Sequence, residues 1–305
     1  MLAELFPIHP SAQTLTLTDQ TCSASACFAM GLRWFVAAQC LGYAAALGAP
    51  SNLNSWLLPE YGDAFAGAAD AGAALALWLA GWALPFLGRA SAGGPNGGTC
   101  GNSLVEKTDA VLLLFAAAWA FGNAAISWAS FLGDRFHATD LIGHAARYSA
   151  PLALLVMRGE HCSSPVVFRR LEWVLRLAMA GTFVGHGLCA YWLKPGFADL
   201  IVGTADTFLG ADWEAAEARE RFALAVLPWI GRMDFVLAAL FLLPGKHLRA
   251  VALLMGVWGV VTAASRMTAF GWERWPDLLV RAANGGIPLL FWWRWKVLAV
   301  NVSSR

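Results

Sequence analysis

Long, mainly apolar runs with few charged side chains recur along this chain. A helix needs about 20 such residues to cross the hydrocarbon core of a bilayer. Only 13% of the 305 residues are charged, against roughly 25% in a typical soluble domain, so lipid must face much of the surface. The sequence therefore predicts an all-α integral membrane protein of about eight transmembrane helices. The segments are 31–48, 64–87, 109–132, 141–157, 173–193, 227–243, 249–270 and 278–297.

The connecting segments fall into two sets of opposite charge. Lysine and arginine are concentrated in segments 88–108, 158–172, 244–249 and the C-terminal tail. Acidic residues are concentrated in segments 49–63, 133–140, 194–226 and 271–277. Because positively charged loops stay on the cytoplasmic side, we expect both termini in the cytoplasm of a multi-pass protein of the bacterial inner membrane.

Several features lie outside the apolar segments. Residues 1–30 contain no lysine or arginine, so they lack the positive start of a signal peptide and are interpreted as a polar N-terminal extension. The Glu/Ala/Arg-rich run 211–221 predicts a short interfacial helix. Tryptophans typical of an aromatic belt at the membrane surface are Trp56, Trp213, Trp229, Trp272 and Trp275.

The two halves of the chain, residues 31–157 and 173–297, resemble each other. In the last apolar segment of each half, an Asp, an Ala-Ala pair and a Pro recur at fixed offsets. Each half has four predicted spans, so the copies share one orientation, which indicates a parallel repeat. The matched pairs are Arg33 with Arg176, Gly42 with Gly185, Tyr43 with His186, Asp70 with Asp234, His144 with Arg281, and Arg147 with Asn284.

The second half also resembles a known family. Its clearest motifs are Gly185-His186-Gly187 and Arg281-x-x-Asn284-x-x-x-Pro288, with Asp234 and Ser265-Arg266 between them. Over residues 171–297 this pattern is similar to the DoxX-like family of four-helix membrane proteins. The first half is a diverged copy, with Tyr43 in place of the His and Arg147 in place of the Asn. The resemblance implies association with quinone-linked redox partners.

Ionisable side chains inside predicted spans are costly and suggest function. Four of them in the second half, together with the amide of Asn284, are predicted to share one depth, where they would line a quinone pocket with an Asp234–Arg266 or Asp234–Arg281 ion pair. Histidine suits such a pocket because it can both give and take a proton near neutral pH. The candidates are His186, Asp234, Arg266, Arg281 and Asn284; their equivalents in the first half are Tyr43, Asp70, His144 and Arg147.

Other interpretations stay open at this point. The buried charges could simply pair across helices and fix the register of the bundle. The chain would then be a structural or accessory subunit of a larger membrane complex. Intramembrane charges in a repeat also fit a small-solute transporter. No motif for a metal or a nucleotide is present, and the net charge of +1 disfavours a nucleic-acid partner. We expect membrane lipid and other membrane or redox subunits as partners.

Overall fold

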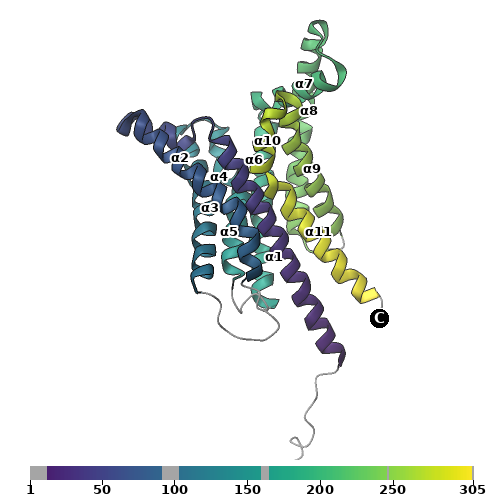
Figure 1. Cartoon of the computed structure of the whole chain (residues 1–305). Coiled ribbons are helices and arrows are strands. Elements are labelled where there is room, and N and C mark those ends of the chain that lie inside the picture. The colour runs from purple at the N-terminus through teal and green to yellow at the C-terminus, as the bar shows by residue number, and fades with distance from the viewer. Residues whose placement is uncertain (1–11, 91–102, 159–164, 246, 304–305) are drawn as a thin grey trace, which may run out of the picture.

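The computed structural model describes residues 12–90, 103–158, 165–245 and 247–303, and every regular element within them is a helix. Figure 1 shows the helices packed side by side as an elongated bundle. The α-helices are α1 Ala12–Ala46, α2 Asn52–Ala90, α3 Ser103–Ser130, α4 Asp140–Gly143, α5 Ala145–Val156, α6 Pro165–Tyr191, α7 Pro195–Leu209, α8 Trp213–Leu242, α9 Leu248–Phe270, α10 Trp275–Val280 and α11 Ala282–Ser303. Two 3-10 turns, η1 His137–Thr139 and η3 Trp272–Arg274, precede α4 and α10.

Six helices of the described residues are long and apolar enough to cross a membrane. They confirm the prediction of an all-α, multi-pass membrane protein. The apolar stretches are Ala24–Ala46 of α1, Asn52–Leu87 of α2, Leu104–Ser130 of α3, Val166–Tyr191 of α6, Glu214–Leu242 of α8 and Leu248–Phe270 of α9.

The remaining two predicted spans, 141–157 and 278–297, are interrupted helices. The backbone leaves helical geometry at His144 (φ −104°, ψ 7°) and at Arg281 (φ −100°, ψ 9°). These are the residues that the sequence alignment pairs between the halves. A 3-10 turn and a short helix precede each break, and a helix containing a proline follows it. The hydrophobic pattern runs through both breaks, so it gave no indication of them.

Two helices begin earlier than the sequence indicated. α1 starts at Ala12, inside the predicted extension 1–30, of which residues 1–11 lie outside the described structure. The predicted interfacial helix 211–221 is not separate, because it forms the first turns of α8. Neither stretch contains a glycine or proline to stop a helix before Gly31 or Pro228. α2, in contrast, bends at Gly62 (φ 77°), two residues before the predicted start of that span.

The two halves pack reciprocally. α1 lies against α10 and α11 of the second half, and α6 lies against α4 and α5 of the first (Figure 1). The matched glycines occupy these crossings. A Cβ at Gly42 would lie 2.5 Å from the backbone N of Val280, and one at Gly185 would lie 2.5 Å from the Cα of Gly143. Only glycine permits such close backbone approach.

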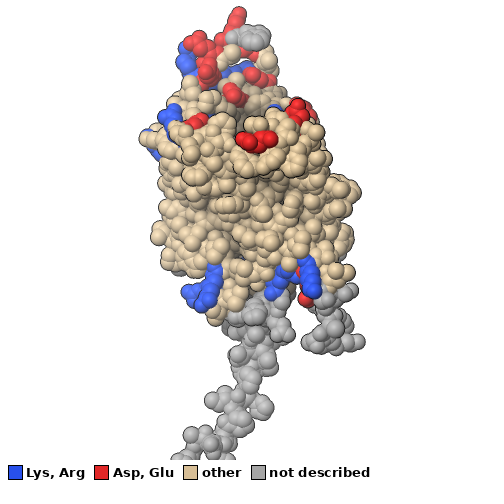
Figure 2. Space-filling model, turned by 90° about the vertical axis from the view of Figure 1, so that its left-hand side faces the viewer, with Lys and Arg blue, Asp and Glu red and all other residues tan. Residues whose placement is uncertain are grey.

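Charged side chains gather at the two ends of the bundle. Figure 2 shows acidic side chains at the end that carries α7, lysine and arginine at both ends, and a band between them with neither. The tryptophans Trp56, Trp229, Trp272 and Trp275 are exposed. The start of α1 and the end of α11 lie together at the end opposite α7.

A buried ion cluster ties α1 to α3 in the first half. Arg33 forms a bidentate pair with Asp109, at 2.6 Å and 2.9 Å, and Arg158 Nε lies 3.0 Å from the same carboxylate. The Asp109 side chain is fully buried. In the second half, Arg176 instead donates to the carbonyl of Phe241 and stacks on Trp173.

Candidate functional site

A cavity of about 270 Å³ lies in the second half, between α6, α7, α8, α9 and the α10–α11 break. All five residues that the sequence singled out in this half lie on its wall. The lining residues are Phe183, His186, Phe197, Leu200, Ile201, Thr204, Leu227, Ile230, Asp234, Trp258, Gly259, Val261, Thr262, Ser265, Arg266, Arg281 and Asn284.

Helix α7 supplies much of the apolar part of this wall. Phe197, Leu200 and Ile201 project into the cavity from α7, and the Phe197 ring meets the His186 ring edge-on at a centroid distance of 6.4 Å. α7 begins at Pro195, which has no N–H to donate and fixes φ as the first turn of a helix requires. The sequence interpretation placed no side chain of this segment in the site.

The polar side chains come mainly from α6, α8, α9 and the α10–α11 break. Sequence reasoning identified the ionisable groups and quoted Ser265 in the family-like motif, but it missed the hydroxyls of Thr204 and Thr262. Thr262 and Ser265 donate to carbonyls of their own helix, and Thr204 bonds to Thr268 at 2.9 Å. Isolated hydroxyls on apolar helices carry no distinctive pattern, so nothing in the sequence marked the two threonines.

Asp234 is bound differently from the prediction. Its Oδ1 accepts a hydrogen bond from Trp258 Nε1 at 3.0 Å, and the residue is 4% exposed. The predicted ion pair with Arg266 or Arg281 is wrong, because within the described residues Asp234 pairs with no arginine. An indole N–H from the neighbouring helix α9 takes the place of the guanidinium.

The two arginines of the cavity make short-range contacts instead. Arg281 Nη1 donates to the side chain and the carbonyl of Asp277, at 2.9 Å and 2.8 Å, one helical turn earlier in the chain. Arg266 Nη1 donates to the carbonyl of Thr262 in its own helix, at 2.6 Å. Arg281 Nε and Asn284 Oδ1 are buried and have no hydrogen-bond partner in the described residues. Both side chains therefore retain unused hydrogen-bonding capacity at the cavity wall.

Three of the four first-half candidates approach this site from across the junction of the halves. The charge of Arg147 acts on His186, Arg266 and Arg281. Tyr43 follows Gly42, which packs against Val280 beside Arg281, and His144 follows Gly143, which packs against Gly185 beside His186.

Asp70, the fourth candidate, lies elsewhere. Its carboxylate accepts hydrogen bonds from the N–H and hydroxyl of Ser51, at 3.0 Å and 2.5 Å, at the start of α2. Asp70 therefore fixes the entry into α2 and does not join the cluster.

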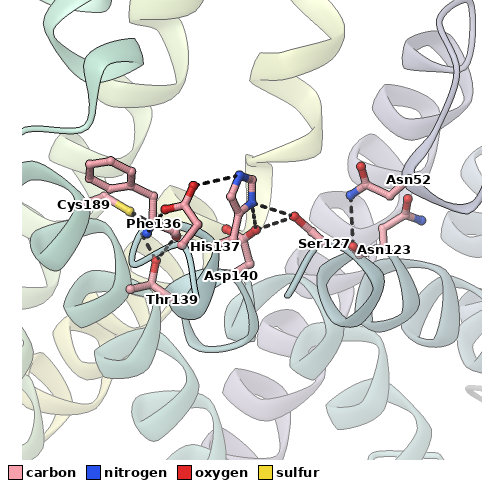
Figure 3. A network of polar contacts seen from close by, with 9 residues as sticks. Asn52, Asn123, Ser127, Phe136, His137, Thr139, Asp140 and Cys189 are labelled. Atoms are coloured by element: carbon pink, nitrogen blue, oxygen red, sulfur yellow. Dashed lines mark hydrogen bonds and ion pairs between the residues drawn. The ribbon is translucent and has the colours of Figure 1, made fainter. Parts of the chain in front are cut away.

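A second polar network joins α3 to η1 and α4. Figure 3 shows Ser127 and His137 converging on Asp140. Ser127 Oγ donates to Asp140 Oδ2 at 2.6 Å, and His137 Nδ1 lies 3.1 Å from the same oxygen and from Ser127 Oγ. Because one ring nitrogen faces both partners, the histidine cannot relay a proton from the serine to the aspartate as a catalytic triad does. The network anchors the 3-10 turn ahead of α4.

Comparison with protein-family models, with curated proteins and with solved structures finds no match to this chain.

Proposed function

We propose that this chain is a DoxX-like membrane subunit that holds a quinone in the cavity of its second half and works with a quinone-linked redox partner. The observation that carries this proposal is the cavity itself. The five predicted residues come from four separate helical segments and line one space together with many apolar side chains.

The cavity suits the chemistry of a quinone. Quinone rings are flat and apolar, with hydrogen-bond acceptors at two carbonyl oxygens. The aromatic and aliphatic side chains of Phe183, Phe197 and Leu227 can contact the ring. Arg281 Nε has a free N–H, and His186 can donate to a carbonyl oxygen and exchange a proton.

Quinone binding to the purified protein tests this proposal. We expect a soluble naphthoquinone to bind the unchanged protein, and His186→Ala and Arg281→Ala each to weaken binding about tenfold or more, because each removes a polar contact at the cavity. Tryptophan fluorescence quenching would measure the affinity, with Trp258 as a reporter in the wall.

Arg232→Ala is the matched control. Arg232 is exposed on α8, two residues before Asp234, and stacks on Trp229 at 4.5 Å. Thermal unfolding would establish that every variant is folded. If the unchanged protein does not bind, or if folded His186→Ala and Arg281→Ala bind as well as Arg232→Ala, the quinone proposal fails.

We further infer that the interrupted helices α4–α5 and α10–α11 cross the membrane, which makes eight spans in two parallel repeats. Three observations support this inference: the equivalent breaks at His144 and Arg281, the equivalent close contacts at Gly42 and Gly185, and the reciprocal packing of the halves. Both ends of the chain would then be cytoplasmic in a bacterial inner membrane, on the side opposite α7.

Cysteine labelling in whole cells tests this orientation. We expect Leu209→Cys, at the end of α7, to react with a membrane-impermeant maleimide in intact cells, and Leu104→Cys, at the start of α3, to react only after lysis. Both positions are well exposed, at 75% and 70%, so access to reagent is matched. The native cysteines would first be replaced by serine or alanine. If Leu104→Cys but not Leu209→Cys were labelled in intact cells, the proposed orientation would be wrong and the α7 end would lie in the cytoplasm.

A further inference from the structure

The described residues around the cavity hold more positive than negative charge. Arg147, Arg266 and Arg281 lie close enough for their charges to repel one another. Within the described residues, Arg147 and Arg266 form no ion pair, and Arg147 Nε is buried without a partner. Histidines His144 and His186 face the same cluster.

The nearby carboxylates do not neutralise this cluster. Asp277 is shared between Arg281 at 2.9 Å and Arg274 at 3.7 Å. Asp234 accepts a hydrogen bond from Trp258 and, within the described residues, forms no ion pair with an arginine. Three guanidinium groups thus face two carboxylates, of which one is already shared and the other is bonded to an indole.

Uncompensated cations are costly at membrane depth. A buried charge loses its hydration and needs a counter-charge or hydrogen bonds in return. Arg147 is 5% exposed, so water cannot supply them fully. A ligand that brings oxygen acceptors and negative charge would satisfy the arginines.

The shape of the cavity defines the rest of that ligand. Most of the remaining wall is apolar and includes Phe197, Leu200 and Ile201 of α7 and Leu227 and Ile230 of α8. An apolar ring or chain fits there. We infer that the cavity selects an amphiphile whose head group is an oxyanion, held by Arg266 and Arg281, with its apolar body between α7 and α8. This inference rests on the proposed function only in taking the cavity as a ligand site.

Two pairs of matched probes test the inference on the full-length protein in detergent. The first pair is 2-hydroxy-1,4-naphthoquinone, an anion at neutral pH, and its neutral 2-methoxy analogue. The second pair is dodecanoate and dodecanol. We expect the anion of at least one pair to bind about tenfold or more tightly than its neutral partner. Preference in the first pair alone identifies an acidic quinone, and preference in the second alone identifies a fatty carboxylate.

Arg266→Gln removes the charge of a residue that, within the described residues, donates one hydrogen bond, to its own helix, so we expect the fold to tolerate it. We expect this variant to lose the preference for the anion, so that the charged and the neutral probe of a pair bind about equally. Arg232→Gln, outside the cavity, should keep the preference.

The outcomes separate this inference from the quinone proposal. Equal binding of charged and neutral probes would overturn the anion inference and leave the quinone proposal standing. Tight binding of dodecanoate with no binding of either quinone would overturn the quinone proposal and leave the anion inference standing. An anion preference that survives Arg266→Gln would also overturn the inference, because the charge that is meant to produce it would be gone.

Discussion

Replacing Asp109 with alanine is expected to lower the free energy of unfolding by about 3–5 kcal/mol, because it leaves two arginines without their shared counter-charge. The Arg33 side chain is 9% exposed and donates two hydrogen bonds to this carboxylate, and Arg158 Nε lies 3.0 Å from it. Unfolding of the purified protein in mixed micelles with increasing sodium dodecyl sulfate would measure the loss.

Asp63→Ala is the control, because Asp63 is an exposed acidic residue on α2 and such substitutions usually change stability by less than about 0.5 kcal/mol. The double variant Arg33→Met, Asp109→Leu should recover part of the loss, since it replaces the bidentate pair with apolar groups. A loss below about 1 kcal/mol for Asp109→Ala would show that the ion cluster contributes little.

Gly185→Ala is expected to cost about 2–3 kcal/mol and to weaken ligand binding as well. The added Cβ would lie 2.5 Å from the Cα and 2.6 Å from the N of Gly143, and backbone atoms cannot rotate away as a side chain can. α6 must therefore move away from α4, which shifts the neighbouring His186 relative to the rest of the cavity. The same micelle titration and the quinone binding assay would measure both effects.

Gly72→Ala in α2 is the matched control, because a Cβ there meets nothing within 4 Å. It should stabilise the protein by about 0.5–1 kcal/mol, since glycine is the poorer helix former. If Gly185→Ala were as stable as Gly72→Ala, the close crossing of α6 and α4 would not exist in the folded protein.

The positions of the site residues could be predicted from the sequence better than their partners. Apolar run lengths give the depth of a residue in a span, so His186, Asp234 and Arg281 could be assigned to one level, and all three line the cavity. Pairing depends on distances of a few ångströms between helices. Asp277 is four residues before Arg281 and reaches it within a single helical stretch, whereas Asp234 must compete from another helix.

Other features left little trace in the sequence. Asp109 is the first residue of a predicted apolar segment, where an acidic side chain normally contacts solvent. Its burial depends on the contact with Arg33, which lies on another helix. The breaks at His144 and Arg281 lie inside runs whose hydrophobic pattern continues without interruption. The alignment of the two halves did pair His144 with Arg281. Comparing the halves therefore indicated that the two positions are equivalent, which the spacing of apolar residues did not.

The reciprocal packing of the halves constrains the order in which the protein is made. α1 leaves the ribosome long before its neighbours α10 and α11, because α2 to α9 lie between them in the chain. The surface around Gly42 therefore stays without this partner until α10 is made, and contacts between such distant segments form slowly. In a nascent chain that stops before Trp275, α1 lacks the helices α10 and α11 against which it packs. Packing of α1 is therefore completed only when these two helices have been synthesised.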